Sequence, residues 1–144
     1  MKISKNEPIL KAPSAILFLI GLMVIIHITF TKILSSGLGA SLFLNLAFVP
    51  NEFSRGDKLW TLISYAFLHG SWEHLIMNMV WLLAFGSAVA KRIESAKIYL
   101  LFFLLCCVIA IQVQYFFSRE SLIPIISASG GVAAMLGASA RFAF

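Results

Sequence analysis

The chain has 144 residues, of which 60% are hydrophobic and 12% are charged, and its formal net charge is +5. Soluble domains carry about a quarter charged residues, so this composition excludes an ordinary water-soluble domain and predicts that lipid is the main solvent of the chain. The basic residues form no stripe interleaved with aromatic residues, so we expect no nucleic-acid partner.

The first predicted element is an apolar helix over residues 14–34. It follows a tail, residues 1–13, that carries Lys2, Lys5 and Lys11. A helix needs about 20 apolar residues to cross the core of a bilayer, and this segment has that length. A secretory signal has a shorter apolar core and a cleavage site of small residues, so the segment is interpreted as a membrane anchor.

The connection over residues 35–71 is rich in Leu and Phe, with Gly, Pro and Asn between them. A solvated linker of this length would be polar, so we predict a structured loop that is partly embedded in the membrane. The rings of Trp60, Tyr65 and Trp72 are expected at the level of the lipid headgroups, where amphipathic aromatic side chains are favoured.

Three further transmembrane helices are predicted over residues 72–90, 98–117 and 129–144. The last would span only about 24 Å, so we expect that the sequence is truncated within a membrane crossing. Basic residues gather in the tail and between the second and third of the four predicted helices, at Lys91, Arg92 and Lys97. By the positive-inside rule these segments are cytoplasmic, and the connection over residues 35–71 lies on the outer side. The predicted fold class is an all-α, multi-pass membrane bundle.

A polar cluster opens the helix over residues 72–90. Ser71 is a predicted N-cap, His74 falls in the first turn, and Asn78 follows four residues later on the same face. Facing lipid, each polar group would cost about 1–3 kcal/mol if it were left without a hydrogen bond. We therefore expect His74 and Asn78 to face a polar cavity or a polar partner.

Simpler roles are open for these residues. His69 and His74 could ligate a metal, but their spacing points them apart on a helix and no third ligand is evident, so no metal is expected. His74 and Asn78 could form hydrogen bonds between helices. Ser129 could be a helix cap, because serine is common at that position. A small-residue face, typical of close helix packing, consists of Gly130, Ala134, Gly137 and Ala138.

In combination, the motifs resemble the rhomboid family of intramembrane serine proteases. His69, His74 and Asn78 follow the order H-x4-H-x3-N at the start of one transmembrane helix, and the sequence SASGG, residues 127–131, opens a later one. Bacterial members have a similar second-helix region, which corresponds here to "YAFLHGSWEHLIMNMVWLLAFGSAVAKR". The resemblance covers about residues 14–144 and implies a helical bundle with four of six expected helices.

The resemblance implies a role for each residue of the motifs. Ser129 is the nucleophile, and His74 and Asn78, with the backbone N–H of Ser129, are oxyanion-hole donors. His69 supports the active-site loop by hydrogen bonding. Peptide hydrolysis passes through a tetrahedral oxyanion, and a fixed donor can stabilise that oxyanion by about 2.7–4 kcal/mol. Gly130, with Gly137 and Ala138, is expected to receive a further helix that brings the catalytic base.

Two features depart from the family pattern. The family motif G-x-S-G has glycine where this chain has Ser127, which adds a side chain where the backbone runs close to the substrate. The family takes its base from a histidine in the sixth helix, and no histidine follows His74 in this sequence. We therefore expect a Ser–His dyad in the complete protein, and we expect these 144 residues alone to be inactive.

The expected function is cleavage of transmembrane protein substrates near their outer ends, in the lipid of the inner cell membrane, with the amino terminus cytoplasmic and the active site facing outward. A serine mechanism needs no cofactor. One alternative is a rhomboid-like pseudoprotease, which binds membrane clients without cleaving them and would lack the histidine in its sixth helix. Another is a small transporter or structural bundle, for which an inverted repeat is typical, but none is evident among the spans.

Overall fold

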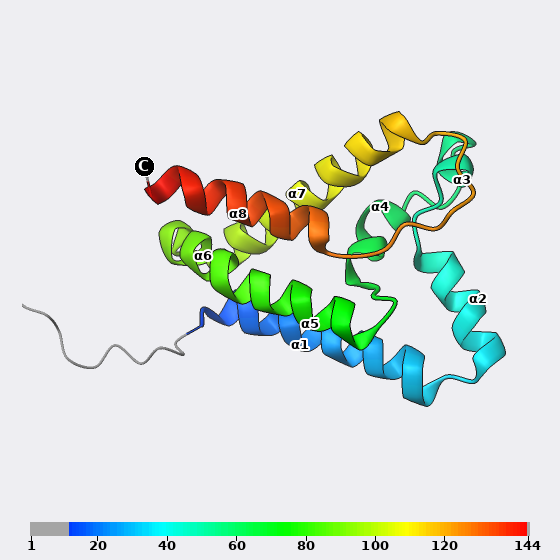
Figure 1. Ribbon diagram of the computed structural model, residues 1–144, viewed down its shortest axis with the longest axis horizontal. Coiled ribbons are helices and arrows are strands. Elements are labelled where there is room, and N and C mark those ends of the chain that lie inside the picture. The colour runs from blue at the N-terminus through cyan, green and yellow to red at the C-terminus, as the bar shows by residue number, and fades with distance from the viewer. Residues whose placement is uncertain (1–11, 144) are drawn as a thin grey trace, which may run out of the picture.

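The computed structural model describes residues 12–143, and these are almost wholly helical (Figure 1). Residues 1–11 of the tail that is predicted to be cytoplasmic, and Phe144, lie outside the described residues. Within the described residues, the only strand-like pairing is an isolated antiparallel bridge between Phe48 and Ile125. The all-α fold class is confirmed. In chain order the helices are α1 (Ser14–Ile28), η1 (Thr29–Ile33), α2 (Ser36–Leu46), α3 (Pro50–Ser54), α4 (Thr61–Ser64), η2 (Tyr65–Phe67), α5 (Trp72–Trp81), η3 (Leu82–Gly86), α6 (Ser87–Ile93), α7 (Ala96–Phe117) and α8 (Ser129–Ala143).

Within residues 12–143, three helical stretches are long and apolar enough to cross a membrane, namely Ser14–Ile33, Trp72–Ile93 and Ala96–Phe117. The first two join consecutive elements, α1 with η1, and α5 with η3 and α6. Large apolar side chains on these stretches point outward, among them Leu17, Phe18, Ile25, Leu101, Leu105 and Ile109. Such surfaces are unfavourable in water, at about 25 cal/mol per Å², and favourable in lipid. The chain is therefore a multi-pass membrane protein.

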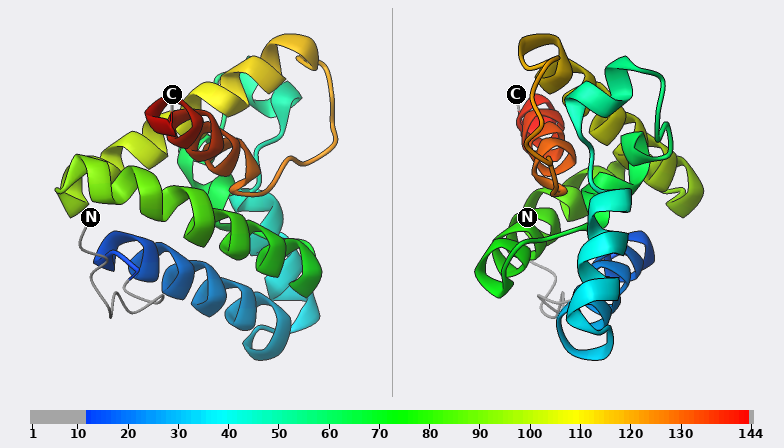
Figure 2. Two further views of the ribbon diagram at one scale, coloured as in Figure 1. Left: turned by 60° about the vertical axis from the view of Figure 1, so that its left-hand side comes forward. Right: turned by 90° about the vertical axis from the view of Figure 1, so that its right-hand side faces the viewer.

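The long helices run back and forth between two ends of the molecule (Figure 1). The starts of α5 and α8 lie toward one end, beside the connection that contains α2 and α4. The start of α1, the turn between α6 and α7, and the carboxyl end of α8 lie at the opposite end. Helix α8 lies beside both α7 and the α5–α6 stretch in the two views of Figure 2. This arrangement brings the polar residues that open α5 and α8 close together.

The core lies along one face of α7, where buried residues recur every four positions at Tyr99, Phe103, Cys107 and Ile111. This spacing aligns them on one side of the helix. Helix α8 packs against this face through glycines. A Cβ atom on Gly131 would lie 2.5 Å from Sγ of Cys107, and one on Gly130 would collide with the side chain of Ala110. The missing side chains allow the two backbones to approach closely.

The prediction that Gly130 helps to receive a further helix is wrong, because this residue faces Ala110 on α7. Ala138 also packs against the core that is already formed. A Cβ atom on Gly137, in contrast, would meet nothing within 4 Å. The rotation of α8 about its own axis therefore turns Gly130 toward α7 and leaves Gly137 without a neighbour.

The connection between the first two long stretches folds into short helices, α2 to α4 and η2, that are tied together by side-chain hydrogen bonds. Trp60 Nε1 donates to the carbonyl of Asn45 at 2.9 Å, and the hydroxyl of Ser64 donates to the carbonyl of Leu46 at 2.7 Å. Tyr65 is buried, and its hydroxyl donates to the carbonyl of Cys107 at 2.7 Å. The expectation that Tyr65 lies among lipid headgroups is therefore wrong, since its polar atom bonds inside the protein.

The segment before α8 is fixed to this connection by backbone hydrogen bonds. Phe48 and Ile125 exchange two of them, with N···O distances of 3.0 and 2.7 Å. Ser127 then donates its N–H to the carbonyl of Tyr65 at 2.9 Å. Because these bonds come just before the first turn of α8, they set where Ser129 stands relative to α5.

Candidate active site

The first turn of α5 is held by a side-chain cap. The hydroxyl of Ser71 accepts a hydrogen bond of 3.2 Å from the backbone N–H of His74, which confirms the predicted N-cap. His74 lies in the turn that this bond closes, and Asn78 follows one turn later on the same face. Asn78 is buried, and its Nδ2 donates to the carbonyl of His74 at 2.8 Å. The cap therefore fixes the backbone that carries both polar side chains.

Ser129 is the first residue of α8, and its side chain is exposed. Its backbone N–H donates to the hydroxyl of Ser127 at 3.1 Å. The same hydroxyl accepts a second hydrogen bond of 3.3 Å from Nδ2 of Asn78. Ser127 thus joins the start of α8 to α5, and its own side chain is buried.

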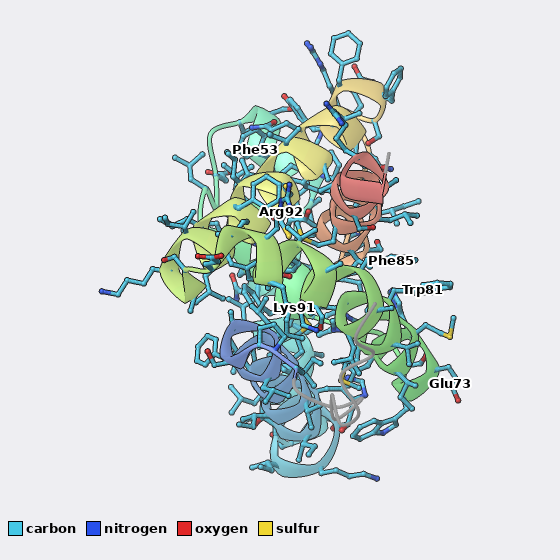
Figure 3. All side chains as sticks on the ribbon, turned by 90° about the vertical axis from the view of Figure 1, so that its left-hand side faces the viewer. Phe53, Glu73, Trp81, Phe85, Lys91 and Arg92 are labelled. Atoms are coloured by element: carbon cyan, nitrogen blue, oxygen red, sulfur yellow. The ribbon has the colours of Figure 1, made fainter. Side chains whose placement is uncertain are left out.

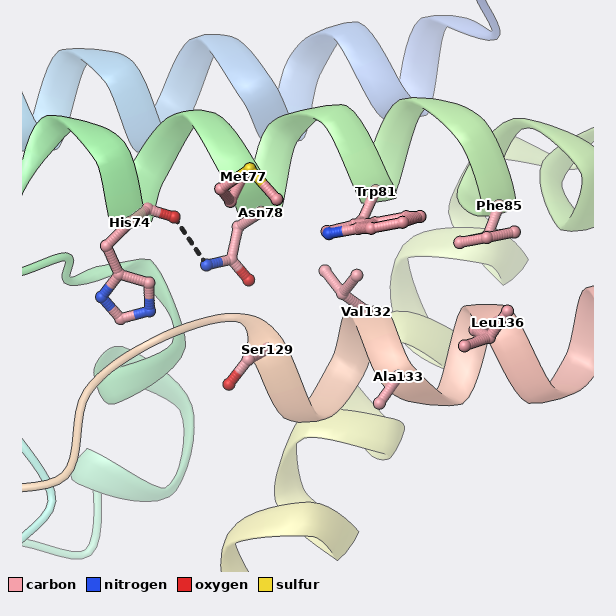
Figure 4. Close-up of a pocket in the computed structure, with 9 residues that line it drawn as sticks. All are labelled: His74, Met77, Asn78, Trp81, Phe85, Ser129, Val132, Ala133 and Leu136. Atoms are coloured by element: carbon pink, nitrogen blue, oxygen red, sulfur yellow. Dashed lines mark hydrogen bonds between the residues drawn. The ribbon is translucent and has the colours of Figure 1, made fainter.

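A cavity of about 360 Å³ lies between the α5–η3 stretch and α8 (Figure 4). Its polar side chains, His74, Asn78 and Ser129, come together at one end, and apolar side chains form the rest. Trp81 and Phe85 project from the same side of the α5–η3 stretch (Figure 3). Their rings are stacked, with 5.4 Å between ring centroids and an angle of 4° between the ring planes. The cavity is lined by His74, Met77, Asn78, Trp81, Phe85, Ser129, Val132, Ala133 and Leu136.

This arrangement places the hydroxyl of Ser129 beside hydrogen-bond donors at one end of a largely apolar cavity. An exposed serine at a helix amino terminus experiences the positive end of the helix dipole, which favours an anion beside it. The amide of Asn78 and the imidazole of His74 approach from the facing helix. Chemically, such a set of groups is suited to acyl transfer, in which a serine attacks a carbonyl and nearby donors stabilise the resulting oxyanion.

His69 lies just outside the cavity, in the loop before α5. Its ring is 4% exposed and packs edge-on against His74, with 5.3 Å between ring centroids. Neither ring nitrogen forms a well-aligned hydrogen bond within the described residues. Burial and, to a smaller extent, the nearby His74 lower the pKa of His69 to about 4. A polar contact with the backbone of Phe67 acts in the opposite direction and raises this pKa. His69 therefore contacts the candidate site as a neutral ring packed against His74.

Sequence reasoning missed several residues that shape the site. Trp81 and Phe85 form the apolar wall of the cavity, and Tyr65 anchors the segment that leads to Ser129. The spacing of Trp81 and Phe85, four residues apart and following Asn78, is a signal that these rings share its side of the helix. No local signal identifies Tyr65, because both of its partners are distant in sequence.

Among the described residues, no group of three or more His, Cys, Asp or Glu side chains is arranged to hold a metal ion. His69 and His74 are neighbours, but no third ligand of these types joins them there.

Comparison with known proteins gives three related findings. The family model described as a rhomboid domain matches residues 56–144, which is more than half of the chain. The rhomboid protease GlpG of Serratia proteamaculans is 36% identical over 52 residues, which cover 36% of this chain and 19% of that protein. The rhomboid protease GlpG of Klebsiella pneumoniae is 39% identical over 49 residues, which cover 34% of this chain and 18% of that protein. The matches span less than a fifth of the length of these two relatives.

Proposed function

Because this chain belongs to the rhomboid family of intramembrane proteases, we propose that its gene product is a serine endopeptidase that cleaves transmembrane protein substrates. One observation carries the proposal. His74 and Asn78 on α5 and Ser129 on α8, which are far apart in sequence, line one end of a single cavity. A structural hydrogen-bond contact between two helices would not require an exposed serine hydroxyl beside such a cavity.

In this proposal Ser129 is the nucleophile. Its hydroxyl attacks the carbonyl carbon of the scissile peptide bond, and the oxygen of that carbonyl becomes the oxyanion. The side chains of His74 and Asn78 and the backbone N–H of Ser129 donate hydrogen bonds to this oxyanion. The apolar wall formed by Trp81, Phe85 and Leu136 supports binding of an apolar substrate segment, because it offers few hydrogen-bonding groups.

We propose that the general base is a histidine outside this sequence, supplied by a further helix. The three histidines of the chain are His27, His69 and His74. His27 is buried against Trp72, with ring centroids 4.6 Å apart, and His69 packs against His74. His74 is assigned to the oxyanion, and one imidazole does not suit both tasks because the base must accept the proton of Ser129.

The proposed location is the inner cell membrane, with the amino terminus in the cytoplasm and the active site facing the outer side. Lys91 and Arg92 support this orientation, because they lie at the end of the molecule opposite the starts of α5 and α8 (Figures 1 and 3). Membrane lipid then surrounds the exposed apolar faces of α1 and α7. Single cysteines placed near Ser71 and near Lys97 test this orientation. A fluorophore that is added from the outer side and does not cross the membrane should label the first cysteine and not the second.

The proposed activity is tested with a fluorophosphonate probe, which labels activated serines covalently. Membranes that contain the full-length gene product are treated with the probe, and labelled protein is detected on a gel. We expect labelling of the wild type and none of Ser129→Ala. Ser139→Ala is the matched control, because Ser139 lies on the same helix and its hydroxyl donates only to the carbonyl of Leu136. If the folded wild type is never labelled, the protease proposal fails, and the pseudoprotease alternative, which binds clients without cleavage, is favoured.

A further inference from the structure

The hydroxyl of Ser127 accepts hydrogen bonds from two groups that are assigned to the oxyanion. One is the backbone N–H of Ser129, at 3.1 Å, and the other is Nδ2 of Asn78, at 3.3 Å. An oxyanion in a serine protease is bound by donors that converge on one point from about 2.7–3.1 Å. The oxygen of Ser127 is the common acceptor of these two donors, at the upper end of this range for Ser129 and slightly beyond it for Asn78.

In this state every hydrogen of the Asn78 side-chain amide and of the Ser129 backbone N–H already forms a hydrogen bond within the protein. Asn78 has two amide hydrogens, and its Nδ2 donates to the carbonyl of His74 and to the hydroxyl of Ser127. Ser129 has a single backbone hydrogen, which is also directed to Ser127. A substrate oxygen can receive these bonds only if the hydroxyl of Ser127 leaves.

The backbone of Ser127 is held in a conformation that disfavours a side chain. Its φ angle is +120°, a region in which glycine is at ease and other residues are strained by about 1–3 kcal/mol. The hydrogen bond from its N–H to Tyr65 helps to hold it there. An ordinary N-cap serine has extended backbone angles with negative φ, so helix capping alone does not explain this geometry.

We propose that Ser127 occupies the oxyanion hole in the resting enzyme, and that the carbonyl oxygen of the substrate displaces its hydroxyl. The exchange breaks no covalent bond. Rotation of the Ser127 side chain about χ1 removes its oxygen and frees the N–H of Ser129 and one hydrogen of Asn78, which then bind the substrate oxygen. Ser127 is thus a positioning residue that protects the two donors from other acceptors and slows the chemical step.

The inference rests on the proposed protease function, and the same fluorophosphonate probe tests both. The rate of labelling of the full-length gene product is measured against probe concentration, which separates the maximal rate, kinact, from the half-saturating concentration, KI. Ser127→Ala removes the competing hydroxyl, so we expect kinact to rise by about 2- to 10-fold, the range that corresponds to one lost neutral hydrogen bond. KI is expected to stay unchanged, because the donors act on the phosphonyl oxygen during the reaction.

Ser121→Ala is the matched control. The hydroxyl of Ser121 also accepts a hydrogen bond from a backbone N–H two residues ahead, that of Ile123 at 3.1 Å, but it lies away from the cavity. This variant should keep the wild-type kinact. Ser127→Gly provides a second test that does not depend on the stability of the alanine variant, because glycine tolerates the positive φ angle. It should also increase kinact.

The outcomes separate this inference from the proposed function. If the wild type is labelled at Ser129 and both Ser127 variants react at the wild-type rate or more slowly, the protease assignment stands and the displacement proposal is overturned. A lower melting temperature with unchanged kinact would assign Ser127 to capping alone. If neither the folded wild type nor any variant is labelled, the protease proposal itself fails, and the displacement proposal fails with it.

Discussion

Tyr65 donates a hydrogen bond of 2.7 Å from its hydroxyl to the backbone carbonyl of Cys107, in the middle of α7. Its own carbonyl accepts the N–H of Ser127 at 2.9 Å. One buried residue of the connecting loop therefore links the longest helix to the segment that precedes Ser129. Burial raises the pKa of the Tyr65 hydroxyl, so this group remains a donor throughout the neutral range.

Tyr65→Phe should destabilise the protein by about 1 kcal/mol, the usual net contribution of a buried hydrogen bond. Thermal unfolding in detergent measures the loss. Tyr115→Phe is the control, because the hydroxyl of Tyr115 pairs with Ser54 at an exposed position. Equal losses of stability in the two variants would show that the buried bond from Tyr65 to Cys107 stabilises the protein no more than the exposed bond between Tyr115 and Ser54.

Gly131→Ala should destabilise the bundle by about 1–3 kcal/mol, because the added methyl group overlaps Sγ of Cys107 and forces α8 away from α7. Gly137→Ala makes the same chemical change on the same helix, where nothing lies within 4 Å. That variant should be unchanged or stabilised by up to about 1 kcal/mol, since alanine favours helix. Unfolding by denaturant, compared between the two variants, checks the prediction. A destabilisation of the same size at Gly137 would contradict the packing described.

Acidification should destabilise the protein through His69. Its pKa in the folded state, about 4, lies below the ordinary value of 6.5, so the unfolded chain binds a proton more readily. The contribution of neutral His69 to the free energy of unfolding is therefore complete above pH 6.5, and it is lost as the pH falls from 6.5 to about 4.

The free energy of unfolding, measured from pH 7 to pH 4 for the wild type and for His69→Gln, tests this pH dependence. Glutamine does not titrate, so the variant should lose less stability on acidification than the wild type. The difference between the two curves isolates His69 from the carboxyl groups, which titrate in both proteins. Parallel curves would rule out a buried neutral His69.

Asn78→Ala should lower the maximal rate of fluorophosphonate labelling by about 10²–10³-fold, the effect seen when one oxyanion donor is removed. The matched control is Asn45→Ala. Like Asn78, Asn45 donates its side-chain amide to the carbonyl four residues earlier, that of Ser41 at 3.1 Å, but at an exposed position. Asn45→Ala should keep the wild-type rate. A similar decrease in both variants would point to helix stability instead of oxyanion binding.

Features that depend on local spacing could be predicted from the sequence. The apolar lengths of the helices, the cap at Ser71 and the shared face of His74 and Asn78 all follow from helix geometry within a few residues. The resemblance of H-x4-H-x3-N and SASGG to rhomboid motifs identified the family, which the match over residues 56–144 supports. The predicted place of Tyr65 was wrong, because aromatic composition alone does not distinguish a headgroup position from a buried hydrogen bond.

The sequence by itself determined that this is a helical membrane protein with polar residues at the starts of two helices, because each of these properties is carried by consecutive residues. Only the tertiary structure decided which of those residues meet. Asn78 and Ser127 are 49 positions apart, and Gly130 faces α7 although its small neighbours suggested another partner. Such contacts depend on how each helix is rotated and where it crosses the next, and small residues permit several packings of similar energy. The packing of α8 against α7, together with the hydrogen bonds that link Tyr65 to Cys107 and Ser127, selects one of them.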